Sequence, residues 1–128
     1  MRTIIVALLA LALSACATLQ PADQQFILEQ AVMRTVDGHP ERAPQIRLAV
    51  DIVEGVLTPG ATRAAILDVA DEVIARQGWS VPDQHAAQYV IVRLMPDVQA
   101  DLPLTEADRD AIFRGIETVR ESLTLMGL

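Results

Sequence analysis

Two histidines are the first residues of this chain that could do chemistry, because imidazole is a common metal ligand and proton carrier. His39 and His85 are the only histidines, and neither has a second metal-ligating residue three or four positions further along. A zinc site needs about three or four such ligands. Both histidines are therefore expected at the surface or near helix caps.

A serine follows a glycine in a way that resembles the start of a nucleophile elbow. Gly78-Trp79-Ser80 carries the first part of that motif, but Val81 stands where the closing part begins and no closing glycine follows. The elbow also needs a preceding strand, which the sequence does not indicate. Ser80 is therefore predicted to cap a helix.

Carboxylates are frequent, and two groups of them could suggest a site. The stretch from Asp97 to Asp110 lacks the alternating acids and the glycine of a calcium loop. Asp68, Asp71 and Glu72 could form a pair for acid–base catalysis, but at helical spacing they form a solvated face with Arg76. No catalytic, cofactor or metal site is predicted, and the chain is not expected to be an enzyme.

Composition narrows the possible partners. The formal net charge is −7, and it is −8 without Arg2, the only charged residue among the first fifteen. Nucleic-acid binding needs a basic face, so no nucleic-acid partner is expected. Aromatic residues are also scarce, which leaves little for a stacking platform; they are Phe26, Trp79, Tyr89 and Phe113.

The first fifteen residues are predicted to be a secretory signal rather than part of the fold. Arg2 gives a positive start, and Ile4 to Leu13 is an unbroken apolar run that ends at two small residues, Ser14 and Ala15. The run is too short for a bilayer core, which needs about 20 apolar residues.

The junction that follows, Leu13-Ser14-Ala15-Cys16, resembles the lipobox of bacterial lipoproteins. The resemblance covers only the signal and its junction. It implies cleavage between Ala15 and Cys16, with a diacylglyceryl group on the Cys16 sulfur and usually acylation of the new amino terminus. The alternative is an ordinary secretory signal with an incidental cysteine. Lipidation also accounts for a single cysteine in an exported chain.

Residues 16–22 are predicted to be the lipidated cysteine and a short tether of roughly 20 Å. Two or three acyl chains give durable membrane anchoring, whereas one binds reversibly. Ala17 is not the aspartate that retains lipoproteins in the inner membrane of enteric bacteria, so the periplasmic face of the outer membrane is the expected location.

Residues 23–128 are predicted to form a small antiparallel bundle of about four to five helices. Apolar residues recur at helical spacing in five segments: Phe26, Ile27, Ala31, Met33 and Val36; Ile46, Ala49, Val50, Val53, Val56 and Leu57; Ile66, Val69, Ala70, Val73 and Ile74; Ala87, Val90, Ile91 and Leu94; Ile112, Ile116, Val119, Leu123 and Met126.

Start signals support three of these helices. Thr58-Pro59, Ser80 with Asp83, and Thr105 with Asp108 have the pattern of N-caps or capping boxes. The alternative is an α+β domain with two strands near residues 46–53 and 88–95, because both segments are rich in β-branched residues. Stripe regularity and the Ser80 cap favour helices.

The function predicted from these features is a membrane-anchored small lipoprotein with a structural or protein-interaction role in the cell envelope. Its partners would be the membrane, through the acyl chains on Cys16, and an envelope protein. A phage-derived lipoprotein acting in host lysis or superinfection exclusion is the alternative, because small size and a short tether also suit that role.

Overall fold

A computed structural model of the chain describes residues 21–128, and this part is all α-helical. The predicted fold class is therefore confirmed. Its elements, in chain order, are α2 (Pro21–Val36), a 3-10 helix η1 (Pro40–Arg42), α3 (Ala43–Val56), α4 (Arg63–Arg76), α5 (Val81–Leu94) and α6 (Glu106–Leu125).

The α+β alternative is wrong for both of its proposed strands. Residues 46–53 lie inside α3, and residues 88–95 form the end of α5 and its C-cap. Within the described residues, 21–128, the only β-type pairing is one isolated antiparallel bridge between Thr62 and Pro103. Helical spacing of the apolar residues, which buries one face of each helix, thus outweighs β-branching here.

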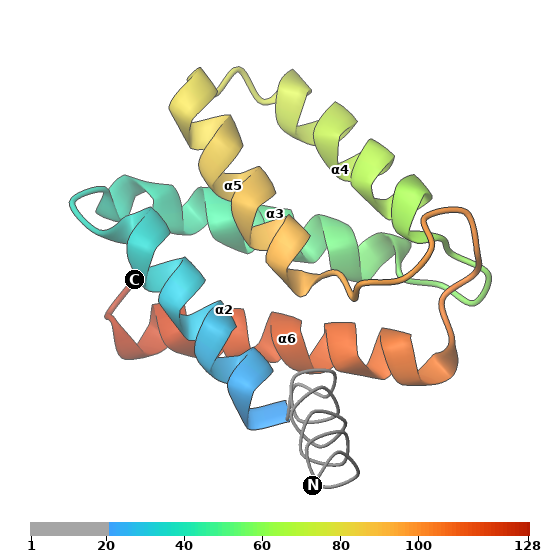
Figure 1. Ribbon diagram of the computed structural model, residues 1–128. Coiled ribbons are helices and arrows are strands. Elements are labelled where there is room, and N and C mark those ends of the chain that lie inside the picture. The colour runs from blue at the N-terminus through green and yellow to red at the C-terminus, as the bar shows by residue number, and fades with distance from the viewer. Residues whose placement is uncertain (1–20) are drawn as a thin grey trace, which may run out of the picture.

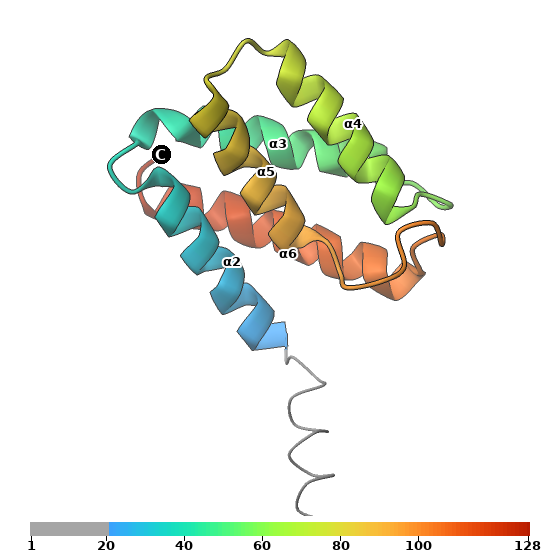
Figure 2. The ribbon, with the colours of Figure 1, turned by 45° about the horizontal axis from the view of Figure 1, so that its top comes forward.

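The helices form two layers (Figures 1 and 2). In one layer α2, α5 and α4 lie side by side, with α5 in the middle and antiparallel to both neighbours. In the other layer α3 and α6 run antiparallel to each other. Helix α3 contacts α4 and α5, and α6 contacts α2 and α5. Because α5 contacts every other α-helix, it is the central element of the predicted antiparallel bundle.

Side-chain caps fix the starts of α4, α5 and α6. Thr105 and Asp108 form the reciprocal capping box that the sequence predicts, with both hydrogen bonds at 3.1 Å. Ser80 Oγ accepts from the Asp83 amide at 3.3 Å. The predicted start of α4 at Thr58 is wrong, because Thr62 Oγ1 accepts from the Ala65 amide and caps the helix four residues later.

The core lies where the two layers meet. The predicted stripe of α5 is buried, and that of α3 is buried except for Val56, which is half-buried. The predicted α6 residues Ile112, Ile116, Val119 and Leu123 are buried too. Met126 is 36% exposed because α6 ends before it, at Leu125. On α4, Val69 is exposed and Val73 only half-buried. This helix is at the edge of its layer, so it buries a narrower stripe than predicted.

The phase of α2 also differs from the prediction. Leu28 and Val32 are buried, whereas Phe26, Ile27 and Met33 are exposed. Ala31 and Val36 are buried as predicted. The helix is therefore turned so that its N-terminal half presents apolar residues to solvent.

Candidate interaction surface

The predicted lipidation and cleavage residues, Cys16 and Ala15, lie outside the described residues. The first residue that the structure describes is Pro21, at the start of α2. Helix α2 starts at Pro21, five positions after Cys16. Any group held at Cys16 is thus joined to the bundle through the first turn of α2.

The two histidines and Ser80 are at the surface or in caps. His39 Nδ1 lies 3.0 Å from Glu41 Oε1, and His85 is exposed on α5. A backbone hydrogen bond at Glu41 itself, and then the hydrogen bond with His39, lower the pKa of the Glu41 carboxyl. Among residues 21–128, no three His, Cys, Asp or Glu side chains come together in a way that could hold a metal ion.

Asp83 has a different role from the one its capping position predicts. Its carboxylate accepts from Arg42 Nε at 2.9 Å and from Gln45 Nε2 at 3.4 Å, instead of from the Ser80 amide. Arg42 also donates to the Thr35 carbonyl at the end of α2, at 3.2 Å. Because of the hydrogen bond from Arg42, the pKa of Asp83 lies below its ordinary value. This group ties α2, α3 and α5 together at one end of the bundle.

Three of the other carboxylates singled out in the sequence have structural contacts, whereas Asp68 is exposed on α4. Glu72 forms an ion pair with Arg76 on α4, and Asp71 accepts a hydrogen bond from Gln88 of α5 at 3.3 Å. Asp108 caps α6.

A further charged cluster, which the sequence alone does not reveal, joins α3 to α6. Arg120 donates to Glu54 and to Asp51, each at 2.6 Å. These two carboxylates raise the pKa of the Arg120 guanidinium above its ordinary value. The cluster pairs one cation with several anions at the surface, as in a structural ion-pair network rather than a proton-transfer site.

The feature that stands out on the described surface is an apolar side of α2. Five residues form what we call the α2 outer face: Phe26, Ile27, Gln30, Met33 and Arg34. Phe26 is 61% exposed and Met33 is 50% exposed. On α5, the neighbouring helix, Val92 is also 48% exposed.

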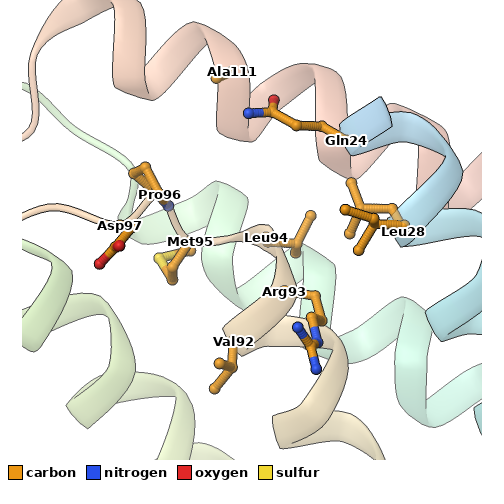
Figure 3. A pocket seen from close by; sticks show the side chains of 10 residues that line it. Gln24, Leu28, Val92, Arg93, Leu94, Met95, Pro96, Asp97 and Ala111 are labelled. Carbon is orange, nitrogen blue, oxygen red and sulfur yellow. The ribbon is translucent and has the colours of Figure 1, made fainter. Parts of the chain in front are cut away.

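Three of the shallow hollows on the described part of the chain border this face. The widest, of about 570 Å³, lies at the end of α2 and is lined by residues that include Met33, Arg34 and Asp37. The other two lie beside α5. One, of about 300 Å³, lies between the start of α2, the end of α5 and the segment after α5, and its walls include Leu28, Leu94, Met95 and the carboxylate of Asp97 (Figure 3). The other, of about 310 Å³, lies between α2 and α5 and is lined by residues that include Arg34, Tyr89 and Arg93. The walls of these hollows combine aliphatic side chains with a few charged groups. They bring together no nucleophile and base.

Arg93 lies on the α5 side of the hollow between α2 and α5. Its guanidinium stands 5.0 Å from the centroid of the Tyr89 ring, within cation–π range. Tyr89 therefore packs against Arg93 and borders the α2 outer face rather than filling the core.

The sequence predicts Phe26, Ile27 and Met33 as core residues, and so the α2 outer face is missed at that stage. The signal that could have revealed it is the excess of apolar residues in α2. Leu28 and Val32 form a second stripe beside the predicted one. A surface helix needs only one such stripe to pack, so the other is left for solvent or a partner.

No helix within residues 21–128 is both long enough and apolar enough to cross a membrane. No protein-family model, curated protein or solved structure matches the chain. The interpretation of the α2 outer face therefore rests on the chemistry and position of its own residues.

Proposed function

We propose that this chain is the precursor of a lipoprotein of the cell envelope, and that its mature part works by contact rather than by catalysis. Cleavage after Ala15 would leave Cys16 as the first residue, carrying the acyl chains. The helical bundle would then be held at the membrane surface, on the periplasmic face of the outer membrane, where it would meet an envelope protein.

The observation that carries this proposal is the spacing between Cys16 and the bundle. Helix α2 starts at Pro21, so only four residues separate the lipobox cysteine from the first helical turn. A lipid on Cys16 would keep the whole bundle beside the bilayer. Such a position suits a protein that braces or contacts other envelope components.

The contacts of the polar residues support a non-catalytic role. Ser80 caps a helix, Asp83 pairs with Arg42, and Glu72 pairs with Arg76. General acid–base or nucleophilic catalysis needs such groups within hydrogen-bond reach of each other and of a substrate. Here they stabilise helix ends and helix pairs instead.

The test is to replace the proposed acylated residue in a bacterial host that processes lipoproteins. Cys16→Ser should abolish palmitate labelling and leave the uncut precursor, because the sulfur that receives the lipid is gone. Ala17→Ser, a neighbouring change that leaves the lipobox intact, should be labelled and cut as the unchanged chain is. Cleavage of the Cys16→Ser chain at the same bond would refute the proposal.

Location can be tested separately by membrane fractionation in an enteric host. Ala17→Asp should move the lipoprotein from the outer-membrane to the inner-membrane fraction, because the lipobox resemblance implies that an aspartate after the cysteine prevents sorting. An unchanged chain already found in the inner membrane would contradict the proposed location and leave the anchor itself intact.

A further inference from the structure

We propose that the α2 outer face lies on the lipid bilayer itself, so that the bundle rests on the membrane with α2 parallel to its surface. This inference rests on the proposed function, because it requires an anchor at Cys16. It adds an orientation: one named face meets lipid, and the rest of the molecule points away from it.

The chain between the proposed anchor and the α2 outer face is short. Five residue steps from Cys16 to Pro21 span at most about 18 Å. Phe26 lies about 8 Å further along the axis of α2, at 1.5 Å per residue. The start of the α2 outer face therefore cannot move far from the surface in which the acyl chains are buried.

The α2 outer face is also largely apolar. Phe26, Ile27 and Met33 are exposed, although the transfer of each side chain out of water would lower the free energy. An exposed cluster of this kind, bordered by polar residues, commonly marks an interaction site. Val92 of α5 extends the apolar area sideways.

Two arginines at this face are suited to phospholipid headgroups. In the described part of the chain, neither Arg34 nor Arg93 forms an ion pair or a hydrogen bond, and Arg93 lies over the ring of Tyr89. Their guanidinium groups border the face and are available to phosphate oxygens, which arginine binds well. The exposed acidic residue Asp23 lies near the start of the helix and Asp37 lies just beyond its end. Glu29, in the middle, is half-buried and accepts a hydrogen bond from Gln25 at 3.2 Å.

Helices that lie in a membrane interface combine these properties, with an apolar side entering about 5–10 Å into the headgroup boundary and basic residues beside it. Figures 1 and 2 show that α4 is at the opposite edge of the same layer, with α5 between it and α2. A bundle that rests on α2 would therefore keep α4 away from the lipid, where an envelope protein could reach it.

The inference can be tested on the full lipoprotein, because acylation leaves Cys16 without a free thiol and a new cysteine can be labelled alone. Phe26→Cys and Met33→Cys would each carry an environment-sensitive fluorophore. Val69→Cys, at an exposed apolar residue of α4, is the matched control. The proteins would be reconstituted into vesicles of phosphatidylethanolamine and phosphatidylglycerol containing nitroxide-labelled lipids.

The labels at residues 26 and 33 should emit at shorter wavelength, be quenched by the nitroxide lipids and be protected from iodide in the water. The label at residue 69 should show none of these effects. Labels at all three positions that remain equally open to iodide would overturn the inference while the anchor stands. Shielding of residue 26 only after envelope proteins are added would overturn it in favour of a protein partner.

Palmitate labelling of the same preparations separates the two proposals. An acylated protein with water-exposed labels means that the orientation is wrong and the lipoprotein assignment holds. A protein without acyl chains means that the lipoprotein assignment is wrong, and the orientation falls with it.

Discussion

Gly115 of α6 lies directly against Leu94 of α5. A Cβ placed on Gly115 would fall 2.9 Å from Leu94 Cδ2 and 3.1 Å from Leu28 Cδ1 of α2. Three helices thus meet at a point where an added Cβ would force the ends of two buried leucine side chains to shift. Glycine inside a helix costs about 0.5–1 kcal/mol relative to alanine, and the close approach of α2, α5 and α6 offsets that cost.

Gly115→Ala should therefore lower the free energy of unfolding, although alanine is the better helix former. Overpacking of a filled core costs about 1–3 kcal/mol, which exceeds the gain in helix propensity. Gly55→Ala is the matched control, because Gly55 lies in α3 with nothing within 4 Å of its added Cβ. That change should stabilise the domain by about 0.5–1 kcal/mol. Urea unfolding of both variants tests the contact, and equal stabilisation would contradict it.

The ion pair between Arg42 and Asp83 makes stability depend on pH. The pKa of folded Asp83 lies below its ordinary value of 3.8 because Arg42 donates a hydrogen bond to the ionised carboxylate. A lowered folded pKa gives stability that is fully present above the ordinary pKa and is lost as the pH falls through the folded value. The melting temperature of the unchanged chain should therefore exceed that of Asp83→Asn at neutral pH, with the difference shrinking below pH 3.8.

Asp101→Asn is the control for that series. Asp101 is exposed, and no ion pair or side-chain hydrogen bond involves it in the described part of the chain. Its variant should melt close to the unchanged chain at each pH. A difference for Asp83→Asn that stays constant from neutral to strongly acidic pH would mean that the carboxylate charge does not contribute.

The phase of α6 can be checked with two adjacent residues. Ile116 is fully buried, while Glu117 has a side chain that is 74% exposed. Ile116→Ala should lower the free energy of unfolding by about 2–5 kcal/mol, since it removes buried methyl groups and leaves a cavity. Glu117→Ala should change it by less than about 0.5 kcal/mol. Thermal or urea unfolding measures both, and similar losses would show that the phase is wrong.

The sequence predicts α3, α5 and α6 well because each has one apolar stripe with charged residues opposite. In α3, for example, Ile46 and Val53 are buried while Asp51 and Glu54 face water. The Thr105–Asp108 capping box is local, so a short segment is enough to predict it. The helical class follows from these features without any knowledge of tertiary contacts.

Other features depend on contacts far apart in the chain. Thr62, not Thr58, caps α4, and the chain before α6 holds this start in place: the Leu104 amide donates to the Ala61 carbonyl at 2.8 Å. Likewise, the partner of Asp83 is Arg42, which is 41 positions away. No local pattern reveals either pairing.

The sequence likewise predicts one part of the candidate site and misses the other. Cys16 could be proposed from the sequence because the motif that resembles a lipobox is short and contiguous. The α2 outer face could not, since α2 carries two overlapping apolar stripes and only the positions of α5 and α6 decide which one is buried. Leu28 packs toward Gly115 of α6, and this contact turns Phe26 outward.

The orientation of α2 therefore predicts which of two substitutions, at Leu28 or at Phe26, lowers the free energy of unfolding, and the sequence pattern predicts the opposite. Leu28→Ala should destabilise the domain by about 2–5 kcal/mol, because Leu28 belongs to the buried core. Phe26→Ala should change the free energy of unfolding by less than about 0.5 kcal/mol, since the larger side chain is already 61% exposed. Urea unfolding of the two variants measures both changes.

The same two variants show whether Phe26 contributes to stability or acts only at the surface. If Phe26→Ala proves as destabilising as Leu28→Ala, the helix is turned toward the predicted stripe and the α2 outer face does not exist. If Phe26→Ala leaves stability unchanged, any effect of that variant on membrane contact reports on the surface alone. The exposed phenyl ring then acts where the chain meets its surroundings, ten positions after the proposed anchor at Cys16.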